Sequence, residues 1–139
     1  MEIPGLHRAI VEQSQDAIIF ADREGVIRLW NRGAEIIFGF GAQEAVGRNL
    51  HIIIPEKLRR GHDAGWRHAM ESGQLRHDGR VLTTRCEQKF GARLYVDLSF
   101  GLLKDEAGHV IGAFAIGRDC TERHIEQQAL RTQAAATHA

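Results

Sequence analysis

Apolar and polar residues alternate most regularly over residues 93–103, where every second side chain from Leu94 to Leu102 is apolar. A repeat of two residues is typical of a β-strand with one buried face. The segments 80–89 and 110–118 flank this strand, and glycine-containing turns separate the three. The pattern therefore predicts three consecutive antiparallel strands in the second half of the chain.

The first half predicts two shorter strands and a series of helices. Leu6, Ile10 and Val11 form an apolar stripe at helical spacing, and turn residues separate two apolar segments that form a hairpin. Asn31 is suited to cap a helix, and Gly73 is suited to end one. The expected elements are a helix over 4–15, strands over 16–21 and 26–30, a helix ending at Phe38, a helical turn over 42–46, a helix over about 56–72 and a tail helix over 121–136.

Helices that lie between two groups of strands must pack on one face of a single sheet. The order of elements thus predicts an α+β fold: a five-stranded antiparallel sheet with short helices on one face, flanked by N- and C-terminal helices. We expect a flanking helix in residues 1–15, one domain in 16–120 and a C-terminal signalling helix in 121–139. A pocket for a flat ligand is expected between the sheet and the helix 56–72.

Composition excludes several classes of function. The 139 residues include 18 Lys+Arg and 18 Asp+Glu, so the formal net charge is zero and no basic field predicts binding to nucleic acid or anionic lipid. Cys86 and Cys120 are not spaced as a metal or redox motif. Residues 1–7 lack the charged start and the apolar stretch of a signal peptide, and no apolar segment approaches the ~20 residues of a membrane span. These features predict a cytoplasmic protein with no nucleic-acid or membrane partner.

The most informative chemistry lies in residues 59–91. Steps of three and four residues place His62 and Trp66 on one face of the expected helix, and Arg80 lies at the start of a strand that can pack nearby. A buried histidine facing an arginine suits an iron-centred cofactor, because neutral imidazole is a good iron ligand. No nucleophile, base and acid are grouped, so we do not expect an enzyme.

With these residues in place, the chain resembles a PAS domain along almost its whole length. The similarity lies in the hairpin of residues 16–25 with Trp30 and Asn31, and in the segments 38–40, 46–48 and 112–123. It implies the PAS fold, and it leaves the ligand open because a fold does not fix a function.

Residues 54–63 are similar to the helix that carries the axial histidine in haem-binding oxygen-sensor PAS domains of the FixL type. This resemblance implies a haem b whose proximal iron ligand is His62, and a domain that senses oxygen or another diatomic gas. It also implies that His68 contacts a propionate and that Leu98 and Phe100 form the apolar distal wall. The expected cofactor-binding residues are His62, Trp66, His68, Arg80, Leu82, Leu98, Phe100 and Ile116, with His62 as the metal ligand.

The chain departs from that subgroup at one position. Those sensors have an arginine that steadies bound oxygen where this chain has Leu82, and Arg80 lies two residues earlier. Positions two apart on a strand point to the same side. Either Arg80 reaches the pocket or the distal chemistry differs, and the selected gas stays open.

Two other interpretations stay open. In flavin-binding LOV photosensors a cysteine directly follows the asparagine of a Gly-Arg-Asn motif, whereas Leu50 follows Asn49 here, which excludes the photoadduct but not flavin or a small metabolite as ligand. The domain can also be a ligand-free interaction module. In each case we expect a homodimer formed through the flanking helices and the sheet, and a signalling partner. Met1 favours a stand-alone protein or an engineered start, and a piece of a larger receptor stays open.

Overall fold

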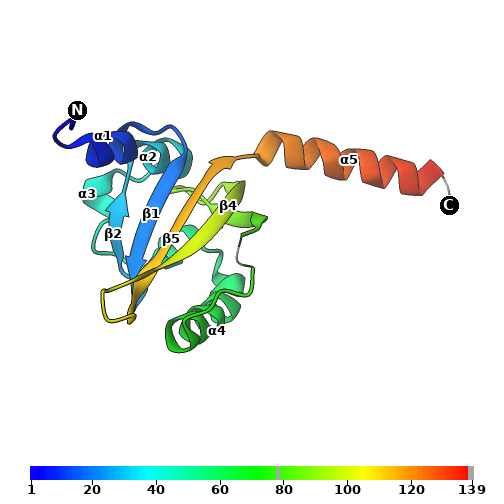
Figure 1. Ribbon diagram of the computed structural model, residues 1–139. Helices are drawn as coiled ribbons and strands as arrows, with labels where there is room; N and C mark the ends of the chain where they lie inside the picture. The colour runs from blue at the N-terminus through cyan, green and yellow to red at the C-terminus, as the bar shows by residue number, and fades with distance from the viewer. Residues whose placement is uncertain (78, 138–139) are drawn as a thin grey trace.

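The computed structural model describes residues 1–77 and 79–137. Five strands form one antiparallel sheet in the order β2-β1-β5-β4-β3 (Figure 1). This sheet confirms the predicted number of strands, and every pair of neighbouring strands in it is antiparallel, as expected. The strands are β1 (Ala17–Asp22), β2 (Ile27–Trp30), β3 (Val81–Glu87), β4 (Arg93–Lys104) and β5 (Val110–Asp119).

The α-helices agree with the expected segments to within a few residues at their ends, whereas the 3-10 helix was not expected. They are α1 (Leu6–Gln13), α2 (Arg32–Phe38), α3 (Ala42–Ala45), the 3-10 helix η1 (Leu50–Ile53), α4 (Glu56–Ser72) and α5 (Thr121–Thr137). Gly73 ends α4 with φ of 69°, a left-handed conformation that glycine adopts at little cost. Val26 was expected in β2, but it pairs only with Asn49 in an isolated bridge.

Asn31 connects three elements of the N-terminal half. Its side-chain oxygen accepts hydrogen bonds from the backbone N–H of Ala34 at the start of α2 and of Ile18 in β1. Its amide nitrogen donates to three carbonyl oxygens between Val11 and Asp16. Because the Asn31 side chain is buried and its partners are at least partly buried, one polar side chain fixes α1, β1 and α2 relative to one another.

The main core lies between the helices and one face of the sheet, which we call the inner face. The inner face presents Ile19 from β1, Ala115 from β5, Leu98 from β4 and Cys86 from β3, which pack with Phe38 of α2. Burial raises the pKa of the Cys86 thiol to about 12, so this cysteine is an inert core residue. A second cluster joins α4 to the sheet through Met70 and Val110.

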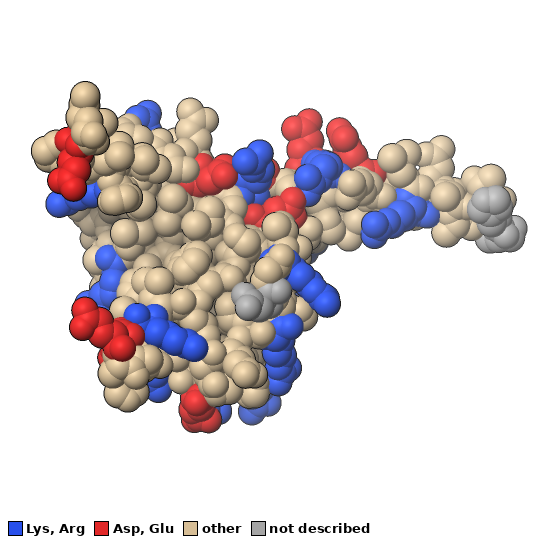
Figure 2. Space-filling model, in the orientation of Figure 1, with Lys and Arg blue, Asp and Glu red and all other residues tan. Residues whose placement is uncertain are grey.

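The opposite face of the sheet, the outer face, carries no helix over its centre. Ile18 of β1 pairs with Ile116 of β5, which pairs with Ser99 of β4, so these side chains point away from the core. The ring of Phe114 lies over Gly101, where a Cβ atom would be only 2.2 Å from the ring. Figure 2 shows a face on which tan atoms fill the middle, over the strands, and charged side chains gather around it.

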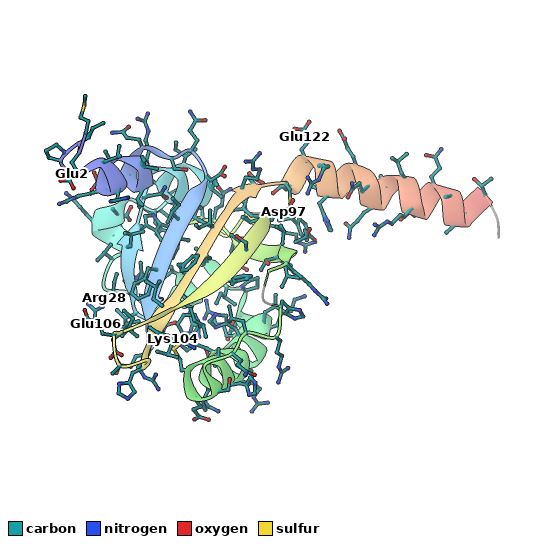
Figure 3. The ribbon with its side chains drawn as sticks, viewed as in Figure 1. Glu2, Arg28, Asp97, Lys104, Glu106 and Glu122 are labelled. Carbon is teal, nitrogen blue, oxygen red and sulfur yellow. The ribbon has the colours of Figure 1, made fainter. Side chains whose placement is uncertain are left out.

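Helix α5 starts beside the outer face and projects away from the sheet (Figure 1). Asp119 accepts a hydrogen bond from the N–H of Thr121, and the ring of Tyr95 stacks on His124 at 3.9 Å between centroids. Asp97, labelled in Figure 3 near the start of α5, pairs with Arg123. No described helix combines the length and the apolar character needed to cross a bilayer.

Candidate cofactor site around His62

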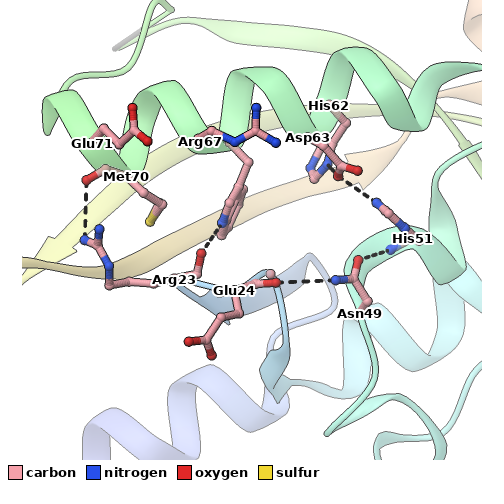
Figure 4. Close-up of a pocket in the computed structure, with 11 residues that line it drawn as sticks. Arg23, Glu24, Asn49, His51, His62, Asp63, Arg67, Met70 and Glu71 are labelled. Carbon is pink, nitrogen blue, oxygen red and sulfur yellow. Dashed lines mark hydrogen bonds and ion pairs between the residues drawn. The ribbon is translucent and has the colours of Figure 1, made fainter.

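A cavity of about 350 Å³ lies between α4, the turn that joins β1 to β2, and the segment before η1 (Figure 4). Arg23, Glu24 and Gly25 line it from the turn, and Asn49 and His51 line it from the segment around η1. Helix α4 contributes side chains between His62 and Glu71. The sequence predicted a pocket between α4 and the sheet. In the structure the cavity lies instead between α4 and the β1–β2 turn.

His62 lies at the edge of this cavity, and its side chain is 30% exposed. Its Nδ1 is 3.4 Å from Oδ1 of Asp63, and its ring stacks on that of Trp66 with centroids 5.7 Å apart. Desolvation by burial lowers the pKa of His62, and the nearby Asp63 carboxylate opposes this shift. The imidazole is therefore neutral at pH 7, which is the form that binds a metal ion.

His51 and Asp63 form an ion pair or hydrogen bond beside His62, with 2.7 Å between Nε2 of His51 and Oδ1 of Asp63. The hydrogen bond from His51 is the main cause that lowers the pKa of Asp63. Sequence reasoning did not single out His51, because it lies outside α4 and eleven positions before His62. Only the fold brings the two imidazoles together.

Hydrogen bonds fix both the backbone N–H and the backbone carbonyl group of His51. Asn49 accepts a hydrogen bond from the N–H of His51, and Arg59 of α4 donates to the carbonyl oxygens of His51 and Ile54. These bonds attach η1 to the first turns of α4. The position of the His51 ring thus depends on backbone contacts as well as on its bond to Asp63.

A second set of bonds attaches α4 to the hairpin turn. Nε1 of Trp66 donates to the carbonyl oxygen of Arg23 at 2.9 Å. The guanidinium of Arg23 donates to the carbonyl oxygens of Met70 in α4, at 3.3 Å, and of Val110 in β5, at 2.8 Å. Figure 4 shows the Arg23 side chain reaching toward α4 below the cavity.

Of the expected cofactor residues, His62 and Trp66 line the cavity. Leu82, Leu98 and Phe100 point to the inner face of the sheet, as the strand pairing requires, but they do not line this cavity. Leu98 belongs to the main core, and Phe100 packs against it.

Three other expected residues lie elsewhere. His68 is exposed on α4, and Arg80 is exposed just before β3, which begins one residue later than expected. Ile116 was expected at the cofactor, but its side chain points to the outer face. Its neighbour Ala115 packs against the core, so Ile116, one residue later and paired with Ser99, faces the other way. The assignment of Ile116 therefore needs correction: a period of two puts it on the side away from His62.

Two curated proteins are similar to this chain over most of its length. The oxygen sensor protein DosP of Escherichia coli K12 is 25% identical over 127 residues, which cover 91% of this chain and 16% of DosP. The sensor protein FixL of Bradyrhizobium diazoefficiens is 29% identical over 126 residues, which cover 89% of this chain and 24% of FixL. The chain thus spans less than a quarter of the length of each. These matches confirm the resemblance to oxygen-sensor PAS proteins.

Solved structures agree on the fold. A PAS domain of a protein from Colwellia psychrerythraea has a TM-score of 0.75 and 21% identity, and the match covers 87% of this chain and 99% of that one. An RNA-binding light-oxygen-voltage receptor has a TM-score of 0.75 and 20% identity, covering 98% of this chain and 38% of the receptor. The family described as PAS fold matches residues 11–125, which is most of the chain. The chain therefore belongs to the PAS family.

Proposed function

We propose that this chain is a PAS sensor module that binds haem b through His62 and responds to oxygen or another diatomic gas. The observation that carries the proposal is the half-buried imidazole of His62 at the edge of a cavity, with a carboxylate beside its Nδ1, and burial lowers the pKa of this ring. Histidines that bind a metal typically donate their second ring N–H to such a group, which orients the ring. The similarity to an oxygen sensor protein supports the same conclusion.

The residues around His62 fit the donor chemistry of haem. Trp66 and Met70 give the cavity an apolar side, and Arg67 provides a cation that can pair with a propionate. We assign the propionate contact to Arg67 instead of His68, because Arg67 lines the cavity and His68 does not. The volume of about 350 Å³ is near the lower end of the ~300–1,000 Å³ of small-molecule pockets. Haem, when bound, supplies an iron atom at which a diatomic gas can bind.

Signalling in this proposal depends on a difference in affinity between two conformations. A ligand that binds one conformation more tightly shifts the population toward it. Helix α4 carries His62 and is attached through Arg23 to the first residue of β5, and β5 ends at α5. We propose that a shift of α4 reaches a partner protein through this strand and α5.

The test is an absorption spectrum of the purified protein after addition of haemin. We expect a Soret band in the wild type and its loss in His62→Ala, because the variant lacks the axial ligand. His68→Ala is the matched control, since it removes an exposed histidine from the same helix and should leave the band unchanged. A full Soret band in His62→Ala would exclude His62 as the ligand.

The same spectrum separates the alternatives. A flavin spectrum would indicate the second ligand class, although Leu50 stands where a photoadduct needs a cysteine. The absence of any chromophore would favour an interaction module.

The apolar outer face supports the pairing of two copies with or without a bound ligand, and we propose a homodimer that forms through this face and the flanking helices.

A further inference from the structure

We infer that His51, His62 and Asp63 form a binding site for a divalent transition-metal ion such as Zn²⁺ or Co²⁺, independent of haem. One ligand atom from each residue lies within 4.8 Å of the other two. The inference goes beyond the proposed function, because it uses Nδ1 of His62 and depends on His51, which the haem proposal does not need.

Two of the distances among the three ligand atoms are close to those around a small ion. Zinc bonds of about 2.0–2.1 Å in a tetrahedral site put the ligand atoms roughly 3.3 Å apart. In the structure Nδ1 of His62 is 3.4 Å, and Nε2 of His51 is 2.7 Å, from Oδ1 of Asp63. Admitting the ion requires the second distance to open by about 0.6 Å and the two imidazole nitrogens, which lie within 4.8 Å of each other, to take up the same spacing.

Contacts outside the site hold the two imidazoles in place. The N–H and the carbonyl oxygen of His51 are both hydrogen-bonded, to Asn49 and to Arg59. The His62 ring lies against Trp66, whose Nε1 donates to the backbone of Arg23. Such supporting contacts reduce the freedom that the ligands would lose on binding, and they are typical of metal sites.

The donor set selects the class of ion. Two imidazole nitrogens and one carboxylate oxygen suit Zn²⁺, Co²⁺ or Ni²⁺, whereas Mg²⁺ and Ca²⁺ prefer oxygen ligands. Three protein ligands leave a fourth position, and the adjoining cavity is open to water or a small ligand there. The cavity also contains cations, but the guanidinium of Arg23 is already bonded to two carbonyl oxygens, and Glu24 and Glu71 add negative charge.

The experiment uses haem-free protein without a polyhistidine tag. Titration with Co²⁺, followed by its visible absorption, and with Zn²⁺, followed by calorimetry, should each give one equivalent per chain. We expect His51→Ala and Asp63→Asn each to lower the affinity at least tenfold, since loss of a ligand exceeds the 10- to 100-fold effect of losing a supporting contact. Circular dichroism checks that each variant folds, and Asp63→Asn keeps the size of the side chain.

His109→Ala is the matched control. His109 and Asp105 form another histidine–carboxylate pair, with 3.5 Å between Nδ1 and Oδ2, but without a second imidazole among the described residues of that turn. This variant should bind the metal as the wild type does. Equal affinity in wild type and His51→Ala, or no binding by the wild type, would overturn the inference.

Haem addition to the same His51→Ala protein separates the two proposals. A retained Soret band with lost Co²⁺ binding supports both of them. Co²⁺ binding by a wild type that shows no Soret band would overturn the haem proposal and leave the metal site. A Soret band in a wild type that binds no Co²⁺ would overturn the metal site and leave the haem proposal.

Discussion

At the scale of single residues, Asn31 shows how one polar side chain can specify a fold. It is the one charged or polar residue in the buried set of the described chain, with 4% of its surface exposed. It accepts two hydrogen bonds and donates three, all to backbone groups. A hydrocarbon side chain in its place would leave several buried groups without a partner, which costs more than the bonds contribute.

We predict that Asn31→Ala lowers the free energy of unfolding by about 2–4 kcal/mol, because it removes a helix cap and leaves buried N–H and C=O groups unpaired. Urea unfolding measures this difference. Asn49→Ala is the control: it removes the cap of η1, where Asn49 accepts from His51, but at an exposed position. A smaller loss in Asn31→Ala than in Asn49→Ala would contradict the proposed role.

The sequence predicts such local features well and distant side-chain contacts poorly. The Asn31 cap and the Gly73 helix end follow from residue type and position. The pair His51–Asp63 does not, because its partners lie on separate elements and have no characteristic spacing. The orientation of Ile116 follows from the register of β5 on β4, which the structure shows and the sequence alone does not.

At the scale of elements, the junction between the sheet and α5 is built around Asp97. Thr83 of β3 donates to Oδ1 of Asp97 at 2.6 Å, and Arg123 of α5 donates to Oδ2. The hydrogen bond from Thr83, followed by that from Arg123, lowers the pKa of Asp97. Because the folded pKa lies below the unfolded value of about 3.9, this stabilisation is complete above that value and is lost as the pH falls through the folded pKa.

We predict that Asp97→Asn lowers the free energy of unfolding at pH 7 by about 1–2 kcal/mol, since it weakens two hydrogen bonds that involve a charged group at the surface. The difference from wild type should shrink below about pH 4, where wild-type Asp97 takes up a proton. Urea unfolding between pH 3 and pH 7 measures both effects. Glu106→Gln, the same type of change in an exposed turn (Figure 3), should have little effect. A difference that does not change with pH would disagree with this account.

Strand boundaries and helix starts were predictable at this scale, but the position of the cavity was not. The period of two fixed which face of β4 is buried, and the inner face contains Leu94, Val96 and Leu98 as expected. The cavity depends on how α4 lies against the hairpin turn. That arrangement rests on bonds from Arg23 and Trp66 to backbone atoms, and a carbonyl oxygen is present at every residue, so no sequence pattern identifies it.

At the scale of the whole molecule, the outer face is an apolar surface whose centre no described helix covers. Besides Ile18, Phe114 and Ile116, it includes Val81, which is 65% exposed. Exposed apolar patches of this kind mark interaction surfaces. Figure 2 shows few charges over the strands, so a second copy would bury few charged groups there.

We predict that Ile116→Glu shifts the protein toward monomer, because it places a charge in the centre of the proposed interface, and that it leaves the Soret band unchanged. Light scattering after size exclusion measures the mass. Ile36→Glu is the control, since Ile36 is a 65% exposed isoleucine, more exposed than Ile116, and lies on α2 outside the proposed interface. A monomeric wild type, or equal masses for wild type and Ile116→Glu, would argue against this interface.

The bonds of Arg23 also have a mechanical consequence. One guanidinium holds the last turn of α4 and the first residue of β5, and β5 extends roughly 33 Å before the chain enters α5. A strand fixed within a sheet moves as a nearly rigid rod, so its two ends cannot shift independently. Replacement of this single arginine would therefore remove the polar link between the helix of His62 and β5, and would leave the apolar contact between Met70 and Val110 to transmit any movement of α4.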